Sequence, residues 1–166
     1  MPRARSAARP ALSHVDTQGR VRMVDVSEKP ETTREAVAEA HVQIGKVALD
    51  AIRLGQVAKG DPLQTARVAG IMAAKRTADI IPLCHPLPLT HITVDLQATQ
   101  AGYRIVARVG TVGRTGVEME ALVAVSAAAL TLYDMLKALD KTIVIGPIQL
   151  LEKRGGRSGD YRRKAR

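Results

Sequence analysis

The stretch ITVDLQATQAGYRIVARV, residues 92–109, decides the fold expected of this chain. Apolar residues recur at every second position on both sides of the tetrapeptide TQAG, with mostly polar residues between them. A period of two residues is typical of a half-buried strand, and two such runs joined by a short glycine-containing segment predict a β-hairpin. An antiparallel sheet is therefore expected to contain residues 92–98 and 103–109.

A second alternating run, REAVAEAHVQI at residues 34–44, carries Ala and Val on one side and Glu, His and Gln on the other. This pattern predicts another strand. A helix remains the alternative, because Ala and Glu are better helix formers than strand formers.

Helices are expected in three places between the strands. Asp61 followed by Pro62 is an N-cap with a first-turn proline, and the helical pattern that starts there continues until Pro82 ends it. The three expected helices cover residues 46–54, 62–81 and 118–139, and a last strand is expected over residues 142–151. The order of these elements predicts an α+β sandwich in which helices pack on one face of an antiparallel sheet.

Net charge is concentrated at the two ends of the chain. The formal net charge of +9 comes from Arg3, Arg5 and Arg9 and from residues 153–166, which leave 15 basic and 15 acidic residues between residues 11 and 152. We expect basic tails at residues 1–11 and 161–166, the first disordered, and a single catalytic domain at residues 12–160. Nucleic acid is an unlikely partner, since the chain has three Tyr and no Phe or Trp for stacking on bases.

The remaining composition predicts a soluble, cytoplasmic oligomer. One cysteine allows no internal disulfide, and no apolar run has the roughly 20 residues of a membrane span. The core must consist of Ala, Val, Leu and Ile. Because these small side chains each bury little area, we expect the subunit to bury further surface against copies of itself.

The only cysteine lies in IPLCHPLPLTH, residues 81–91, where prolines at 82, 86 and 88 restrict the backbone to extended conformations. Three interpretations compete: a metal half-site, a thiol nucleophile with its base, and a rigid backbone edge that holds a ligand. Adjacent Cys84 and His85 should point to opposite sides of an extended chain, which disfavours both a shared metal and a nucleophile–base pair. No metal site is expected.

The helix expected at residues 118–139 has a wide apolar face, predicted to be core, and a few ionisable residues opposite it. The predicted core positions are Ala121, Val125, Ala128, Leu132, Met135, Leu136 and Leu139. Asp134 and Lys137 are three residues apart and can touch, either as an ordinary ion pair or as an acid–base couple lining a cleft. Glu120 lies about 21 Å from Asp134 along the axis, so the two are not expected to contact one small group.

Two loops have the composition of phosphate-binding segments. KGD at residues 59–61 precedes a helix N-terminus, and GGRSGD at residues 155–160 offers backbone N–H groups to an anion. The Walker pattern G-x-x-x-x-G-K-[ST] is absent.

Seven segments, read in order, resemble the molybdenum cofactor biosynthesis protein C family, whose members are cyclic pyranopterin monophosphate synthases. The segments that carry the resemblance are MVDVSEK (23–29), KGD (59–61), AGIMAAKRT (69–77), IPLCHPL (81–87), TGVEMEAL (115–122), LYDMLKA (132–138) and IGPIQLLEKRGGRSGD (145–160). The resemblance runs from about residue 12 to residue 160 and leaves out both tails.

The resemblance implies a lyase of molybdenum cofactor biosynthesis with no cofactor of its own. The implied substrate is 3′,8-cyclo-7,8-dihydroguanosine 5′-triphosphate, made from GTP by a radical partner enzyme, and the products are cyclic pyranopterin monophosphate and pyrophosphate. The implied subunit is ferredoxin-like, in a homohexamer that is a trimer of dimers with pockets between subunits.

The resemblance also assigns roles to individual residues. The implied catalytic group is Lys59, Asp134 and Lys137. The implied substrate-binding residues, from the PLCH and VEME motifs and from scattered polar positions, are Leu83, Cys84, His85, Met119, Glu120, Asp25, Lys29, Lys75, Arg76 and Lys153. Two rival functions stay open on the sequence alone: an RNA- or ribosome-associated protein that uses its basic ends, and a zinc-dependent nucleotide cyclohydrolase.

Overall fold

The computed structural model describes residues 18–164. The predicted basic residues Arg3, Arg5 and Arg9 lie outside this range. Five strands form one antiparallel sheet in the order β2-β3-β1-β4-β5. The strands are β1 (Thr32–Gln43), β2 (Leu89–Ala98), β3 (Gly102–Gly113), β4 (Val144–Arg154) and β5 (Tyr161–Arg162). The helices are α1 (Lys46–Arg53), α2 (Pro62–Ala74), α3 (Thr77–Ile80) and α4 (Glu118–Leu136).

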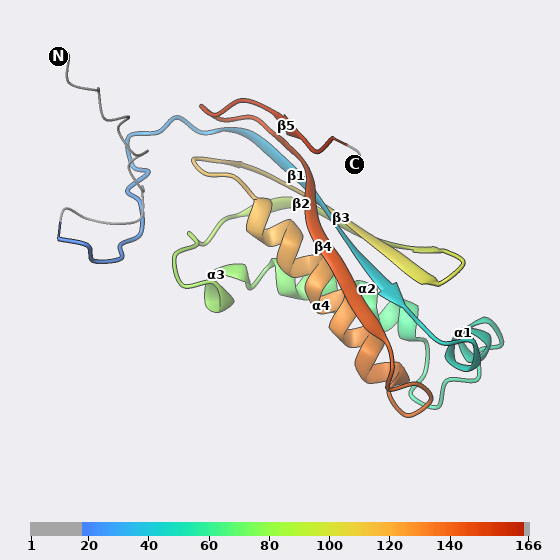
Figure 1. Cartoon of the computed structure of the whole chain (residues 1–166). Helices are drawn as coiled ribbons and strands as arrows, with labels where there is room; N and C mark the ends of the chain where they lie inside the picture. Colours follow the sequence, from blue (N-terminus) through green and yellow to red (C-terminus); the bar gives the residue numbers. More distant parts are fainter. Residues whose placement is uncertain (1–17, 165–166) are drawn as a thin grey trace, which may run out of the picture.

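The two long helices α2 and α4 cover one face of this sheet (Figure 1). With its first four strands in the order β2-β3-β1-β4 and a helical segment in each crossover, the domain has the ferredoxin-like α+β arrangement. The predicted fold class is confirmed.

The alternating run that starts at Arg34 forms β1, so the strand interpretation is correct and the helical alternative is wrong. On one face of β1, Ala36, Ala38, Ala40 and Val42 are buried in the core beneath the helices. On the other face, Glu39 accepts hydrogen bonds of 2.6 Å from both Arg104 Nε and Gln149 Nε2. Tertiary burial and cross-strand pairing therefore override the helix propensity of Ala and Glu.

The predicted hairpin forms β2 and β3, and Thr99–Gly102 makes its turn. Gly102 has φ +151°, and a Cβ placed there would collide with the carbonyl oxygen of Val42 on the neighbouring strand β1. Only glycine permits this close approach of backbone to backbone.

The single helix expected over residues 62–81 is instead two helices. Asp61 caps α2 as predicted, because its Oδ1 accepts hydrogen bonds from the backbone N–H groups of Leu63 and Gln64. The helix ends at Ala74, where the buried Thr77 hydroxyl donates to the Ala74 carbonyl at 3.0 Å and α3 begins. A side chain that satisfies a terminal carbonyl stabilises the end of a helix.

Helix α4 is the centre of the core. Six of the seven residues predicted to be core on α4 are buried, whereas Leu139 lies beyond the end of the helix and is exposed. By length and composition α4 is the one helix within residues 18–164 that could cross a membrane, but 56% of its apolar window is buried inside the fold. Its apolar character fits a core helix.

Candidate functional site

The first group of predicted site residues is a cluster of one carboxylate and two ammonium groups near the C-terminal end of α4. Lys59 Nζ lies 2.8 Å from Asp134 Oδ2, and Lys137 Nζ lies 2.8 Å from Asp134 Oδ1. Lys59 Nζ also donates to the backbone carbonyl of Asp134 at 2.8 Å. The expected contact between Asp134 and Lys137 is present, and Lys59 reaches the same carboxylate from the loop before α2.

These contacts shift the protonation equilibria of the cluster. Hydrogen bonds from Lys137 and Lys59 lower the pKa of Asp134 from 3.8 to about 2. The same carboxylate raises the pKa of Lys137 above 10.5, first through its hydrogen bond and then through its charge. All three side chains are about half exposed, so the cluster lies at the surface of a single chain. It consists of two ammonium groups, which can donate protons, in contact with one carboxylate.

The second group surrounds a cavity of about 330 Å³ between the PLCH segment and the start of α4. The predicted binding residues that line it are Leu83, Cys84, His85, Met119, Glu120 and Lys29. The PLCH segment begins as a turn closed by a hydrogen bond of 3.0 Å from Cys84 N to the Ile81 carbonyl, so it is not extended throughout. Cys84 and His85 both line this cavity.

Two acidic groups of this cavity have raised pKa values. Glu120 has a relative exposure of only 4%, and burial followed by the nearby charge of Glu118 raises its pKa. Burial also raises the pKa of the Cys84 thiol, with a further contribution from the charge of Glu120. A thiol with a raised pKa is a poor nucleophile, which agrees with the interpretation of this segment as a binding edge.

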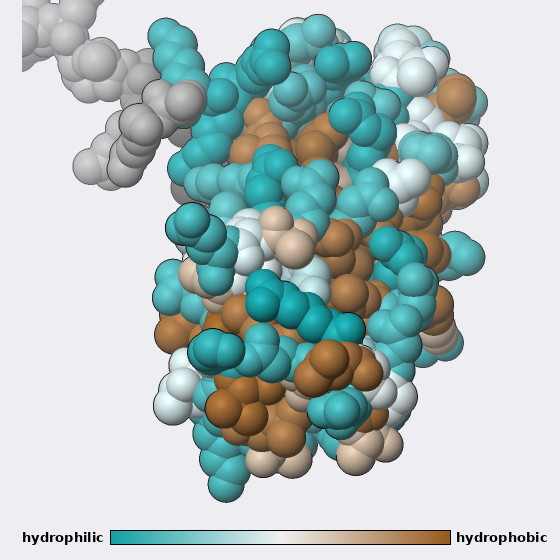
Figure 2. All heavy atoms as spheres, turned by 90° about the vertical axis from the view of Figure 1, so that its right-hand side faces the viewer, coloured by the Kyte–Doolittle hydropathy of each residue, from teal (hydrophilic) through white to brown (hydrophobic). Residues whose placement is uncertain are grey.

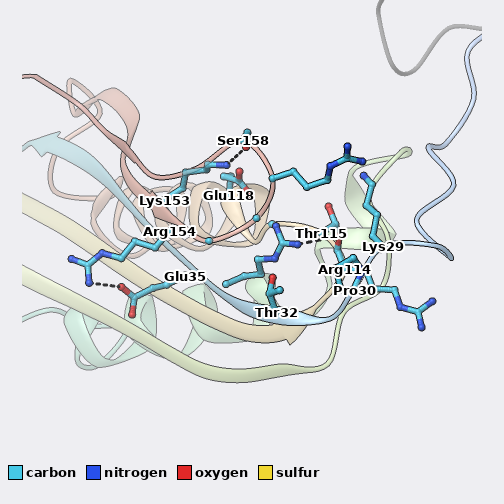
Figure 3. Close-up of a pocket in the computed structure, with 15 residues that line it drawn as sticks. Lys29, Pro30, Thr32, Glu35, Arg114, Thr115, Glu118, Lys153, Arg154 and Ser158 are labelled. Carbon is cyan, nitrogen blue, oxygen red and sulfur yellow. Dashed lines mark hydrogen bonds and ion pairs between the residues drawn. The ribbon is translucent and has the colours of Figure 1, made fainter.

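The third group lines a larger cavity of about 570 Å³. Lys29 and Lys153 lie on opposite sides of it (Figure 3). This cavity adjoins the one at the PLCH segment, because Lys29, Thr115, Gly116 and Glu118 line both. The predicted binding residues of the PLCH segment and of β4 are therefore brought together at one continuous site.

Four arginines that were not among the predicted site residues line the larger cavity: Arg34, Arg114, Arg154 and Arg157. Arg34 Nε is buried and has no hydrogen-bond partner among residues 18–164. Within the same range of residues, four basic side chains form no ion pair with a carboxylate: Lys29, Arg34, Lys153 and Arg157. Arg114, in contrast, forms an ion pair with Glu31 at 3.7 Å. Positive charge that the described carboxylates leave unpaired makes this cavity suitable for an anion.

The GGRSGD loop is held against the cavity by its two glycines. Gly155 and Gly156 both have φ +85°, and a Cβ on Gly156 would collide with Nη1 of Arg34. The glycine pair was the sequence signal that could have led to Arg34. Two adjacent glycines indicate that the loop backbone lies too close to a neighbouring group, here the Arg34 guanidinium, for a Cβ to fit.

Two further predicted residues, Lys75 and Arg76, line a small cavity of about 100 Å³, whose wall also includes His85 and Glu120. Asp25 lines none of the three cavities. Its carboxylate instead accepts hydrogen bonds from the backbone N–H of Ser27 at 2.9 Å and the Ser27 hydroxyl at 2.7 Å, which lowers the pKa of Asp25.

The acid–lysine cluster is not brought together with the cavities. Neither Lys59, Asp134 nor Lys137 lines any of them, and Glu120 and Asp134 stand about 21 Å apart along α4 at 1.5 Å per residue. Within a single chain the predicted site is therefore in two halves.

Apolar side chains remain exposed near the end of the molecule that carries α1 and the loop after α4. Val47, Leu54, Leu139 and Val144 have relative exposures between 44% and 69%. Figure 2 shows apolar side chains gathered in the lower half of the face that includes α1. Among the residues that the structure describes, no group of three His, Cys, Asp or Glu side chains is arranged to hold a metal ion.

The fold and these cavities define a ferredoxin-like α+β protein that combines a cavity lined by basic side chains with an acid–lysine cluster. The model of the MoaC family matches residues 23–156, and the chain belongs to this family. The resemblance stated from the sequence motifs is thereby confirmed.

Curated relatives cover almost the whole chain. A cyclic pyranopterin monophosphate synthase of Thermomicrobium roseum is 60% identical over 155 residues, which cover 92% of this chain and 93% of the relative. Proteins of the same name from a Roseiflexus species and a Nostoc species are each 57% identical over 152 residues. These matches cover 90% of this chain and 96% and 90% of the two relatives, respectively.

Proposed function

We propose that this protein is a cyclic pyranopterin monophosphate synthase of molybdenum cofactor biosynthesis. It converts 3′,8-cyclo-7,8-dihydroguanosine 5′-triphosphate to cyclic pyranopterin monophosphate and releases pyrophosphate, which makes it a lyase. The observation that carries the proposal is the pair of adjoining cavities. The larger cavity has cations that no described carboxylate pairs with, which suits the triphosphate end of the substrate. The smaller cavity has His85 and Glu120, which suit the guanine-derived ring at the other end.

The triphosphate binds in the larger cavity. Lys29, Arg34 and Lys153 supply positive charge that no carboxylate within residues 18–164 neutralises. When an oxygen of the sugar-derived part attacks the α-phosphorus, the new P–O bond replaces the bond to the bridging oxygen of pyrophosphate. The cations stabilise the charge that develops on this leaving group. Arg114 and Arg157 extend the same positive surface.

The guanine-derived ring binds in the smaller cavity, against the PLCH edge. The ring has several N–H donors, and the polar side chains of this cavity include the acceptors Glu120 and His85. Leu83, Cys84 and Met119 supply apolar contact with the ring faces. Lys75 and Arg76 are proposed to contact substrate from the small cavity beyond His85. Asp25 acts by shaping the segment before Lys29.

The cluster of Lys59, Asp134 and Lys137 transfers protons during ring opening and reclosure. The Asp134 carboxylate holds both ammonium groups at 2.8 Å, so it orients them and keeps Lys137 protonated at neutral pH. Lys137 is thus suited to act as a general acid, and Asp134, which stays ionised because its pKa is lowered to about 2, holds the ammonium group in position.

A second copy of the chain joins the two halves of the site. One substrate molecule does not span about 21 Å along α4 from the Glu120 end to the Asp134 end. A subunit interface that brings the cluster of one chain to the cavities of another removes this distance. The exposed Val47 on α1 and Leu54 just after it offer apolar surface for such an interface. The proposed assembly is a homohexamer built as a trimer of dimers.

The proposed setting is the cytoplasm, downstream of the radical enzyme that makes the cyclised GTP derivative. The domain at residues 12–160 carries the activity with no cofactor of its own, and the basic segments at residues 1–11 and 161–166 lie outside it. Tyr161 and Arg162, within the second of these segments, pair with β4 as strand β5.

The test is a turnover assay with the cyclised substrate, in which pyrophosphate and the pterin product are followed together. The proposal expects one pyrophosphate for each pterin formed. Arg34→Gln should raise KM more than it lowers kcat, because it removes a charge from the anion-binding cavity. Arg67→Gln is the matched control: Arg67 Nε donates to the Val94 carbonyl at 2.9 Å and Arg67 lines none of the cavities. Pterin formation without pyrophosphate release would refute the assignment.

A further inference from the structure

The cavity that holds the unpaired cations also holds a carboxylate that none of them pairs with. Glu118 is the first residue of α4, and it lines both the cavity of about 570 Å³ and the adjoining one of about 330 Å³. Within residues 18–164 its side chain forms neither a hydrogen bond nor an ion pair. Glu118 therefore brings a negative charge, uncompensated by the described residues, to a cavity whose other charged side chains are mostly basic (Figure 3).

The backbone before α4 leaves the space that this carboxylate occupies. A Cβ on Gly116 would collide with Oε2 of Glu118, so the carboxylate folds back over the glycine. Gly116 itself lines both cavities. Any larger residue at position 116 would push the carboxylate away, because two atoms cannot share this space. The segment TGVE, residues 115–118, therefore sets where the charge of Glu118 lies.

Glu35, the other carboxylate that lines the larger cavity, is already neutralised within the protein. It pairs with Arg108 and lies 3.9 Å from Arg154. The dipole of α4 favours a carboxylate in the first turn, which accounts for the residue type at position 118. It does not remove the repulsion that the Glu118 carboxylate exerts on an anion in the cavity.

A lone carboxylate in an anion-binding cavity weakens binding of the anion unless a cation lies between them. Magnesium suits this position, because it is usually bound by one or two protein carboxylates together with phosphate oxygens, and it keeps several water ligands. The basic side chains of the cavity remain available for the other phosphate oxygens. A carboxylate beside several cations is therefore a suitable arrangement for a phosphate chain that carries a divalent cation.

We propose that Glu118 is the protein ligand of a magnesium ion that enters with the triphosphate of the substrate and leaves with pyrophosphate. The inference rests on the proposed function and adds a metal subsite to its triphosphate cavity. Within residues 18–164, no group of three His, Cys, Asp or Glu side chains could hold the ion without the phosphates. The free protein should therefore bind magnesium only weakly, and the ion is part of the bound substrate, not a resident cofactor.

Binding of inorganic pyrophosphate, measured by calorimetry without magnesium and at saturating magnesium, tests the inference without any turnover. In the wild type, magnesium should tighten binding about ten-fold, because the ion converts the repulsion by Glu118 into an attraction. In Glu118→Gln, pyrophosphate should bind more tightly than to the wild type when magnesium is absent, since the repelling charge is gone. Adding magnesium to Glu118→Gln should change the Kd by less than about two-fold.

Glu35→Gln is the matched control, because it removes a carboxylate from the same cavity that is already paired with arginine. Its ratio of the two Kd values, without and with magnesium, should stay at about ten, as in the wild type. Manganese takes similar oxygen ligands and can be counted after equilibrium dialysis. The wild type should retain about one manganese ion per chain when pyrophosphate is present and well below one when it is absent.

Several results would overturn the inference: pyrophosphate that does not bind the wild type or binds equally well without magnesium, a gain from magnesium that is as large in Glu118→Gln, or manganese retained equally without pyrophosphate. Absence of turnover with the cyclised substrate, together with the expected pattern of pyrophosphate binding, would instead refute the proposed function and leave the magnesium subsite standing. The two failures are therefore distinguishable.

Discussion

Replacing Asp134 by Asn removes one negative charge from between two ammonium groups while leaving the shape of the side chain nearly unchanged. In the wild-type protein, Lys59 and Lys137 each approach the carboxylate to 2.8 Å. The pKa of Asp134 is about 2 rather than 3.8, so the two lysines favour the carboxylate over the acid by nearly two orders of magnitude. The coupling is reciprocal, because the carboxylate also favours the protonated form of Lys137.

The pH dependence of turnover should change because Asp134 stabilises the protonated form of Lys137. Lys137 has a raised pKa in the wild type, so its proton is retained until the pH rises past that value. Without the carboxylate, the pKa of Lys137 should fall, because both the hydrogen bond and the negative charge that raise it are removed. If Lys137 is the general acid, the alkaline limb of the kcat profile moves to lower pH. The kcat itself should fall by about 10² to 10⁴-fold, the range that a lost proton-transfer group costs.

The assay measures pyrophosphate and pterin formation between pH 7 and pH 10.5 for the wild type, Asp134→Asn and Asp50→Asn. Asp50 is the matched control: its carboxylate lies 2.6 Å from Lys46 and 3.5 Å from Arg53 on α1, so it is likewise a carboxylate between two cationic side chains. Asp50→Asn should stay within about two-fold of wild type, as expected for a surface ion pair. Asp134→Asn turning over within about three-fold of wild type, with an unmoved alkaline limb, would refute the role of the cluster.

Three further predictions concern burial, packing and metal. Glu120→Gln should weaken substrate binding yet raise the Tm at pH 8. Because the folded protein raises the pKa of Glu120, ionisation of this carboxyl opposes folding as the pH rises through that pKa, and a neutral amide avoids this cost. The gain in Tm should therefore shrink towards pH 5, where Glu120 is less ionised. Equal Tm differences at both pH values would contradict this. Gly70→Ala should destabilise the fold by about 1–3 kcal/mol in urea unfolding despite the better helix propensity of Ala. The reason is that its Cβ would lie 2.9 Å from the Ala124 carbonyl oxygen. Gly110→Ala is the control, because the nearest atom to its Cβ, apart from the adjacent residues, would be the Arg34 carbonyl oxygen at 3.6 Å. Purified protein should contain well below one zinc ion per chain and keep its turnover after treatment with a zinc chelator; stoichiometric zinc would favour the cyclohydrolase alternative.

The periodic segments were predictable from the sequence because their pattern and their burial coincide. The alternation around TQAG and after Arg34 forms β1, β2 and β3, and six core positions of α4 are buried as expected. The break between α2 and α3 was not predicted, since it depends on a hydrogen bond from the buried Thr77 hydroxyl to the Ala74 carbonyl. Leu139 was assigned to the core on helical spacing, but the helix ends before it.

Candidate site residues could be predicted from the sequence only where they belong to a recognisable motif. The family motifs identified Lys59, His85 and Asp134, whereas Arg34 and Arg114 were missed. Arg34 lies on β1 and Arg114 lies just after β3, and they come together because β1 pairs with β3 in a register that sets Arg34 opposite Thr111. Strand register places residues from distant parts of a chain side by side. A single sequence does not give this register, so basic residues such as these cannot be told apart from ordinary solvated surface charges.

The central claim is that one chain supplies the acid–lysine cluster and another supplies the cavities of the same site. Subunit mixing tests it directly: Asp134→Asn and His85→Ala chains, each nearly inactive alone, are unfolded together, refolded in equal amounts and assayed for pterin and pyrophosphate. If each site draws one half from each chain of a symmetric dimer, random mixing should restore about a quarter of the wild-type activity, because half of the dimers carry one intact site. Activity of the mixture no higher than that of the two variants measured separately would mean that both halves of the site come from the same chain.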